Sequence, residues 1–95
     1  MKVYVAGKIS DLNKERVCKM FKKAENFLLA KGHDVLIPIV SPEYKSLSHE
    51  DYMHICYAMI DACDAVYMLD NWRESAGAKL EYEYACSKNK EIIYE

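Results

Sequence analysis

The feature that most constrains the fold is a regular alternation of short apolar runs with longer segments of helical period. The apolar runs suited to strands are 3–6, 34–37, 65–69 and 91–94. The segments in which apolar residues recur at helical spacing are about 13–31, 48–61 and 76–88. The order βαβαβαβ with right-handed crossovers predicts an α/β fold, a small doubly wound parallel sheet of Rossmann or flavodoxin type with strand order 2-1-3-4.

Size and composition predict a folded, soluble protein with one domain spanning residues 1–95. The chain has 95 residues, of which 52% are hydrophobic and 29% are charged. Its apolar runs are far too short to cross a bilayer. The first residues, 1–7, reach a glycine too early for a signal peptide and are typical of a strand. We therefore expect a cytoplasmic protein without a membrane partner.

Charge and the metal-ligating residue types argue against several classes of partner. A net charge of −2 does not suit binding to duplex nucleic acid. The cysteines lie far apart without CxxC pairing, which favours reduced core thiols over a metal site: Cys18, Cys56, Cys63 and Cys86. The histidines also lack ligand spacing: His33, His49 and His54. We expect neither a metal nor a cofactor.

Glu81 occupies a position in the last helical segment where a core residue is expected. On a helical wheel of residues 76–88, it lies near the middle of an arc formed by Gly77, Ala78, Leu80, Tyr84 and Ala85. The opposite side collects Lys79, Tyr82, Glu83 and Cys86. An unpaired buried carboxylate is costly or has a shifted pKa. Two interpretations remain open at this point, a structural ion pair, for example with Lys88, and a functional carboxylate.

The residues before Glu81 favour a ligand site. Ser75 is a good N-cap residue, and Gly77 in the first turn costs stability but leaves room for a close approach to the backbone. The free N–H groups of a helix start also favour an anion. In a doubly wound sheet, ligands bind where the loops after the first and third strands meet, here 7–11 and 70–75. We therefore expect Gly7, Gly77 and Glu81 to lie together.

Other residues of these loops are weaker candidates. Trp72 could stack on a base or anchor the packing, Asp70 could bind a hydroxyl or form a turn, and Arg73 suits solvent better than a phosphate. Lys8, Ser10 and Asp11 suit either a phosphate or a solvated loop, and Asp64 suits a structural role. The candidate substrate-binding residues are Gly7, Lys8, Ser10, Asp70, Trp72, Ser75 and Gly77. The proline-containing segment 38–47 is a loop of the kind that often covers a ligand.

Residues 2–7, residues 61–69, Trp72 and residues 75–81 together resemble the nucleoside 2-deoxyribosyltransferase superfamily, in particular its short bacterial and phage members, over essentially the whole chain. The resemblance implies that Glu81 is the nucleophile on the anomeric carbon of a nucleoside or nucleotide, forming a glycosyl-enzyme intermediate. It also implies that Tyr4 hydrogen-bonds and orients this carboxylate, and that Ser75 contacts sugar hydroxyls or a 5′-phosphate.

One position departs from the family pattern. Where the family usually has an aspartate that helps to activate the leaving base, this chain has Cys56, and a thiol substitutes poorly for a carboxylic acid. His54 and Asp61 are not in register to replace it. We therefore consider hydrolysis of an N-glycosidic bond, preferred over base transfer in so short a chain, beside a non-catalytic module that binds a nucleotide or an ADP-ribose-like ligand.

Pure oligomer scaffolding is a third hypothesis, but it leaves Glu81 and Gly77 without a role. We predict a homo-oligomer in any case, because a small sheet offers its aromatic residues limited core: Tyr52, Tyr57, Trp72 and Tyr82.

Overall fold

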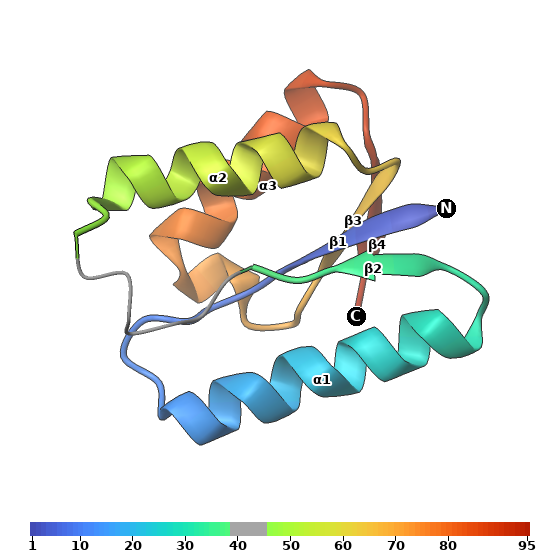
Figure 1. The fold of residues 1–95 in the computed structure, drawn as a ribbon, viewed down its shortest axis with the longest axis horizontal. Helices are drawn as coiled ribbons and strands as arrows, with labels where there is room; N and C mark the ends of the chain where they lie inside the picture. The colour runs from blue at the N-terminus through green and yellow to red at the C-terminus, as the bar shows by residue number, and fades with distance from the viewer. Residues whose placement is uncertain (39–45) are drawn as a thin grey trace.

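A computed structural model describes residues 1–38 and 46–95 (Figure 1). The middle of the loop expected to cover a ligand, including Pro42, lies outside the described residues. The elements in chain order are β1 (Lys2–Ala6), α1 (Lys14–Ala30), β2 (Asp34–Leu36), α2 (His49–Asp61), β3 (Ala65–Met68), the short 3₁₀ helix η1 (Trp72–Glu74), α3 (Ala76–Ser87) and β4 (Glu91–Tyr94). The predicted alternation of strands and helices is confirmed.

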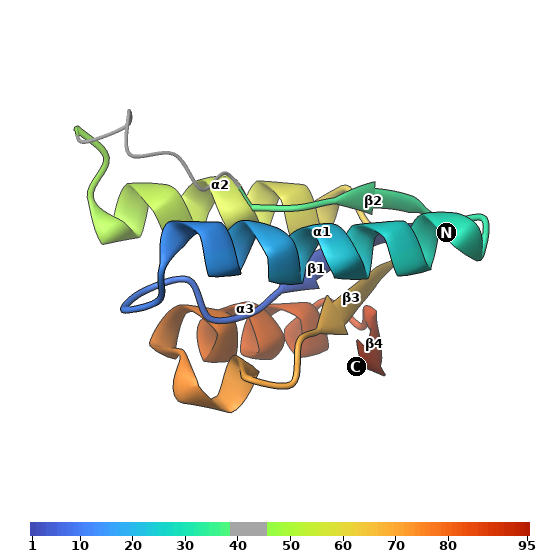
Figure 2. The same ribbon diagram turned by 90° about the horizontal axis from the view of Figure 1, so that it is seen from below.

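The strands form one parallel sheet in the order β2-β1-β3-β4, as predicted. In the register of this sheet, Val3 of β1 lies opposite Val35 of β2 and Ala65 of β3. Figures 1 and 2 show α1 on one face of the sheet and α2 and α3 on the other. Because helices cover both faces, the central strands are apolar along their length. Their carboxyl ends lie together at one edge, where the predicted site should be.

Successive residues of the strands point to opposite faces and build two separate cores. The core on the α1 side contains Val3, Val5, Val17, Phe21, Ala24, Leu28, Ala65, Tyr67 and Leu69. The core on the side of α2 and α3 contains Tyr4, Ala6, Cys56, Ile60, Cys63, Val66, Met68, Trp72, Ala78 and Ala85. Both cores therefore share β1 and β3, and they differ in which alternate residues they use.

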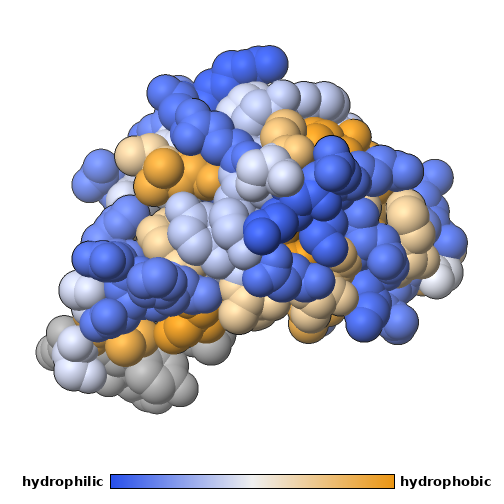
Figure 3. All heavy atoms as spheres, turned by 90° about the horizontal axis from the view of Figure 1, so that it is seen from above, coloured by the Kyte–Doolittle hydropathy of each residue, from blue (hydrophilic) through white to orange (hydrophobic). Residues whose placement is uncertain are grey.

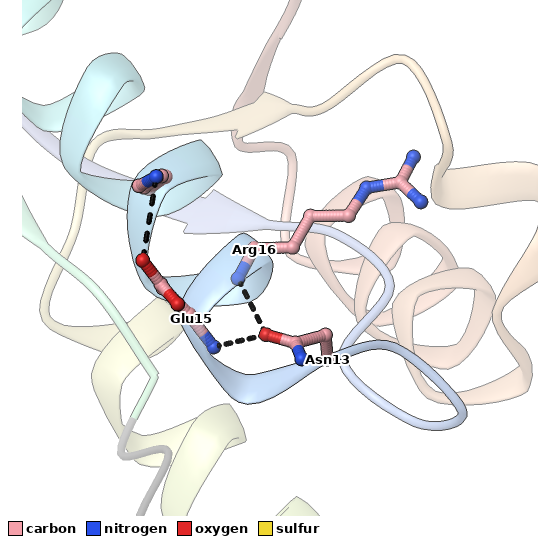
Figure 4. A network of polar contacts seen from close by, with 4 residues as sticks. Asn13, Glu15 and Arg16 are labelled. Carbon is pink, nitrogen blue, oxygen red and sulfur yellow. Dashed lines mark hydrogen bonds and ion pairs between the residues drawn. The ribbon is translucent and has the colours of Figure 1, made fainter.

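Side chains cap the helix starts. The Asn13 Oδ1 atom accepts hydrogen bonds from the backbone N–H groups of Glu15 and Arg16 at 2.8 and 3.3 Å (Figure 4). Ser48 and Asp51 form a reciprocal capping box at the start of α2. These caps satisfy N–H groups that have no partner within the helix, so the helices begin where the sequence predicts.

Helix α3 buries a narrower stripe than the helical wheel predicts. Its buried residues are Ala78, Glu81 and Ala85, whereas Leu80 is 40% exposed. Tyr82 was expected on the solvent side but is half-buried, because its ring packs 4.7 Å from the centre of the Trp72 ring. The prediction that Glu81 is buried is confirmed, and the predicted width of the buried arc is wrong.

The expectation that all cysteines are core thiols is also wrong. Cys56 and Cys63 are buried, but Cys18 and Cys86 are exposed because α1 and α3 turn these positions away from the sheet. Hydrophilic residues cover much of the face seen in Figure 3, with smaller hydrophobic areas between them. In the described parts of the chain, no helix is long and apolar enough to cross a membrane.

Candidate active site

The first wall of the site is the loop that follows β1. Gly7 is buried, and a Cβ atom at this position would lie 2.5 Å from Leu69 Cδ1 and 2.9 Å from Leu69 Cβ, so only glycine fits against β3. The Lys8 backbone N–H donates a hydrogen bond of 3.0 Å to the Asn71 side chain. These contacts hold the first loop against the segment after β3. The two loops therefore meet at the switch point, as the topology predicts.

The second wall is the start of α3. Ser75 is the N-cap residue, and its Oγ atom accepts a hydrogen bond of 3.1 Å from the Ala78 backbone N–H. At Gly77 a Cβ atom would lie 3.7 Å from Met53 Sδ and 3.9 Å from Ser75 Oγ, which are ordinary contact distances. Packing therefore demands glycine at position 7 but not at position 77, where its absence of a side chain keeps the helix start open.

A cavity of about 490 Å³ lies between these walls and α2. Of the sequence-predicted site residues, six line it: Gly7, Lys8, Ser10, Ser75, Gly77 and Glu81. The prediction that Glu81 faces a pocket between the Gly7 loop and the Ser75 loop is confirmed. A volume of several hundred Å³ is typical of small-molecule sites.

Glu81 is only 6% exposed and has no cationic partner in the described part of the chain. The Tyr4 hydroxyl donates a hydrogen bond to Glu81 Oε2, the contact that the family resemblance implies. An ion pair with Lys88 is absent, because the Lys88 ammonium lies over the Tyr84 ring, 5.5 Å from its centre. Among the described residues the carboxylate is therefore held by a neutral donor, and none of them supports the structural ion-pair interpretation.

Burial sets the protonation states around Glu81. It raises the pKa of the Glu81 carboxyl to about 7, against the opposing effect of hydrogen bonds from Tyr4 and Cys56. Burial, followed by the charge of Glu81, raises the pKa of Tyr4 far above its usual value. Burial likewise raises the pKa of the Cys56 thiol to about 11. Tyr4 and Cys56 therefore stay protonated near neutral pH, where Glu81 changes charge.

The structure does not bring Asp70 and Trp72 to the cavity. Trp72 is 8% exposed and packs on Tyr82 and Tyr94, with 6.5 Å between the ring centres of Trp72 and Tyr94. Asp70 is exposed, and its backbone N–H donates a hydrogen bond of 2.9 Å to the Glu95 side chain. Trp72 begins η1, and the chain reaches the cavity wall at the end of this helix, at Glu74 and Ser75. The geometry thus favours packing for Trp72 and gives no support to substrate binding by either residue.

Two further sequence interpretations concern residues away from the cavity. The Arg73 guanidinium lies 4.9 Å from the centre of the Trp72 ring. Asp64 accepts a hydrogen bond of 2.9 Å from the Lys2 backbone N–H and so joins β1 to the start of β3, which agrees with a structural role. Within residues 1–38 and 46–95, no group of three or more His, Cys, Asp or Glu side chains could hold a metal ion.

Sequence reasoning missed the contribution of α2 to the cavity. His49, Tyr52 and Met53 of this helix line it, together with Glu74 from η1. Tyr52 precedes Cys56 by four residues, so the two share a helix face. This spacing, together with the expected position of Cys56 near the site, could have indicated that Tyr52 faces the cavity. Asn71 was also missed, because its role is to hold the Lys8 backbone rather than to line the cavity.

Two solved structures have a similar fold. The Clostridium botulinum CMP N-glycosidase BcmB matches with a TM-score of 0.64 and 23% identity, over 99% of this chain and 70% of that chain. The 2-deoxyribosyltransferase from Leishmania mexicana matches with a TM-score of 0.68 and 20% identity, over 98% of this chain and 62% of that chain. The chain shares its fold with these two proteins.

Residues 1–94 match the family described as "Domain of unknown function (DUF4406)". The chain belongs to this family. No curated protein matches the sequence, and the chain spans less than two thirds of the length of the Leishmania protein. At these identities the solved structures establish a shared fold, so the activity has to be argued from the site.

Proposed function

We propose that the protein hydrolyses the N-glycosidic bond of a nucleoside or a nucleoside 5′-monophosphate, with Glu81 as the nucleophile. The observation that carries this proposal is a buried carboxylate held by the neutral Tyr4 hydroxyl at the wall of a 490 Å³ cavity, with no cationic partner among residues 1–38 and 46–95. Burial of such a carboxylate destabilises the fold, and a functional role explains why it is nevertheless present. The names of the two structurally similar proteins, an N-glycosidase and a deoxyribosyltransferase, support the same type of bond.

In the proposed reaction, Tyr4 holds Glu81 Oε2, and Oε1 attacks the anomeric carbon of the sugar. The bond from C1′ to the base nitrogen breaks, and its electron pair leaves with the base. The carboxylate stabilises the oxocarbenium-like transition state and then forms a covalent bond to the sugar. In the second step water attacks C1′, the bond from C1′ to Glu81 Oε1 breaks, and a proton of the water passes to solvent, which releases the sugar and restores the carboxylate.

The start of α3 is suited to the sugar and phosphate of such a substrate. Ser75 and Gly77 place the first turn of α3 at the cavity, and Lys8 lies on the opposite wall. A helix N-terminus favours negative charge, and a lysine adds to that preference. We assign Gly7, Lys8, Ser10, Ser75 and Gly77 to substrate binding on this basis.

Hydrolysis is preferred over transfer to a second base because several of the described residues that line the cavity are exposed to solvent. Ser10, Asp11, His49 and Glu74 line the cavity and are exposed. A glycosyl intermediate at Glu81 would therefore meet water readily, whereas transfer requires that water be excluded.

A binding module without catalytic activity is the second candidate, and Cys56 is the observation that favours it. The thiol lies beside Glu81 where a carboxylic acid would assist the departing base, and its raised pKa, about 11, keeps it neutral. Such a protein would hold a nucleotide or an ADP-ribose-like ligand in the same cavity without breaking it.

One assay separates the two candidates. The protein is incubated with ribonucleosides, 2′-deoxyribonucleosides and their 5′-monophosphates, and free base is measured by chromatography, with Glu81→Gln as the matched control. Base release that depends on Glu81 supports the hydrolase. Tight binding without release contradicts it and supports the binding module, in which case Cys56→Asp is the substitution to test for recovered turnover.

We also propose that the chain forms a homo-oligomer, although the structure changes the reason. The aromatic residues named from the sequence are buried or half-buried, so they do not form an exposed patch. The exposed large hydrophobic residues include Phe27, Leu29, Leu80 and Tyr94, with exposed fractions of 40–54%. Static light scattering at micromolar concentration should give a multiple of the 11.0 kDa chain mass, and a monomer mass would refute the proposal.

A further inference from the structure

The Tyr52 hydroxyl stands out among the polar groups of the cavity. Within residues 1–38 and 46–95, its oxygen is the one buried side-chain oxygen or nitrogen atom without a partner in hydrogen-bond geometry, and the neighbouring Cys56 thiol is at most a weak partner. Native proteins pair nearly all such groups, because a buried unpaired hydroxyl is destabilising. Tyr52 also lines the cavity that contains Glu81. A ligand atom that accepts a hydrogen bond would satisfy this hydroxyl.

The surroundings of Tyr52 make it a donor close to the reacting carboxylate. It lies one helical turn before Cys56 on α2, and the Cys56 thiol interacts with both the Tyr52 hydroxyl and the Glu81 carboxyl. Burial, followed by the proximity of Cys56 and Glu81, raises the pKa of Tyr52 above its usual value. The hydroxyl therefore keeps its proton and offers it to an acceptor.

Other hydroxyl groups near the nucleophile already have partners. Tyr4 donates to Glu81, and Ser75 accepts from the Ala78 backbone. Asp11, His49 and Glu74 line the cavity but are exposed, so water satisfies them. The start of α3 is suited to the sugar and phosphate, which leaves the base to be contacted from α2.

We infer that Tyr52 donates a hydrogen bond to the base acceptor atom next to the glycosidic nitrogen, which is O2 of a pyrimidine or N3 of a purine. This inference rests on the proposed function and adds the contact that assists the leaving base. When the bond from C1′ to the base breaks, its electron pair spreads onto this acceptor atom. The hydrogen bond stabilises that charge, the base then takes a proton from solvent, and Tyr52 keeps its own proton.

The inference is tested by binding to the Glu81→Gln protein, which cannot consume its ligand. Isothermal titration with CMP, AMP and ribose 5-phosphate compares this parent with a version that also carries Tyr52→Phe. Loss of one hydrogen bond to the base should weaken CMP and AMP binding by about two- to tenfold and leave ribose 5-phosphate binding unchanged. Because the removed oxygen has at most the weak Cys56 thiol as a partner in the unliganded protein, Tm should be nearly equal or higher.

Tyr57→Phe is the matched control. Tyr57 lies on the same helix, is half-buried and stacks on Tyr84 with 4.3 Å between ring centres, and it does not line the cavity. The same substitution there should leave the affinities for all three ligands unchanged. If Tyr57→Phe and Tyr52→Phe weaken binding equally, the effect comes from the helix and the inference is overturned.

Other results would also contradict the inference. Equal weakening of all three ligands by Tyr52→Phe would place the hydroxyl on the sugar or phosphate, and no weakening would show that it contacts nothing on the ligand. In the active protein, Tyr52→Phe should slow base release less from 5-fluoro-UMP than from UMP, because fluorine stabilises the departing anion. Equal slowing overturns the inference alone. Failure of the Glu81→Gln parent to bind any ligand overturns the proposed function together with it.

Discussion

The two faces of the sheet use neighbouring residues of the same strand for different purposes. Val3 and Val5 of β1 point toward α1 into a core of hydrophobic residues. Tyr4, which lies between them, points toward α2 and α3, and its hydroxyl donates a hydrogen bond to Glu81. The backbone is common to both faces, so the difference lies in the side chains. The α1 face stabilises the fold, and the opposite face places a carboxylate where it is costly to keep.

This contrast suggests that stability and chemistry can be changed separately. In the described residues, Glu81 is the buried charged side chain, and its pKa of about 7 shows that the fold disfavours its ionised form. Among residues 1–38 and 46–95, the α1 core contains no buried charged side chain. Substitutions on one face should therefore alter base release, and substitutions on the other should alter the free energy of unfolding.

The largest effect is expected for Glu81→Gln. The amide keeps the shape of the side chain but cannot act as an anionic nucleophile, so base release should fall by at least about a thousandfold while ligand affinity is largely retained. Chromatography of released base and titration calorimetry measure the two quantities. Release at the wild-type rate would show that another group is the nucleophile.

Phe21→Ala should show the opposite behaviour. Phe21 is 2% exposed in the α1 core, and truncation of such a side chain costs about 3–5 kcal/mol in the free energy of unfolding. Base release per folded molecule should stay at the wild-type level, because α1 does not line the Glu81 cavity. Urea unfolding, combined with activity in stabilising solutes, tests this. A specific loss of activity in the folded fraction would show that the two faces are coupled.

The sequence predicted most of the fold because the fold depends on periodicity. Strand order, helix caps and the burial of Glu81 follow from local patterns and from the handedness of crossovers. Trp72 and Tyr82 could not be placed in this way, because their burial depends on η1 and β4 meeting beside α3. The cavity role of Tyr52 was missed for a similar reason. It depends on how α2 lies across the sheet, and no pattern within α2 specifies that arrangement.

The next largest effect is expected in the pH dependence of the free energy of unfolding, which should come from Glu81 on the face of α2 and α3. The Glu81 pKa is raised from 4.5 to about 7, so the folded protein retains a proton that the unfolded chain has lost. The contribution of Glu81 to stability is complete below pH 4.5 and is lost as pH rises through about 7, amounting to about 3 kcal/mol. Urea unfolding across this range should show the decline. Glu81→Gln should remove the decline, and an unchanged slope in that variant would contradict the assignment.

Tyr4→Phe should have the smallest effect of this series. It removes one hydrogen bond to the carboxylate, so base release should fall by about tenfold, well short of the loss in Glu81→Gln. Because that hydrogen bond lowers the Glu81 pKa, the rise of activity with pH should move to higher pH. Rate profiles from pH 5 to 9 measure both changes. A loss as large as that of Glu81→Gln would give Tyr4 a role beyond orientation.

The most direct test of the account is to trap the bond between Glu81 and the sugar. A 2′-deoxy-2′-fluoronucleoside 5′-monophosphate should slow hydrolysis of the intermediate, because fluorine at C2′ disfavours the oxocarbenium-like transition state. Mass spectrometry of the intact protein and its peptides should then find one sugar phosphate attached to the peptide that contains Glu81. Base release without covalent addition, or addition to a different residue, would contradict the assignment of Glu81 as the nucleophile.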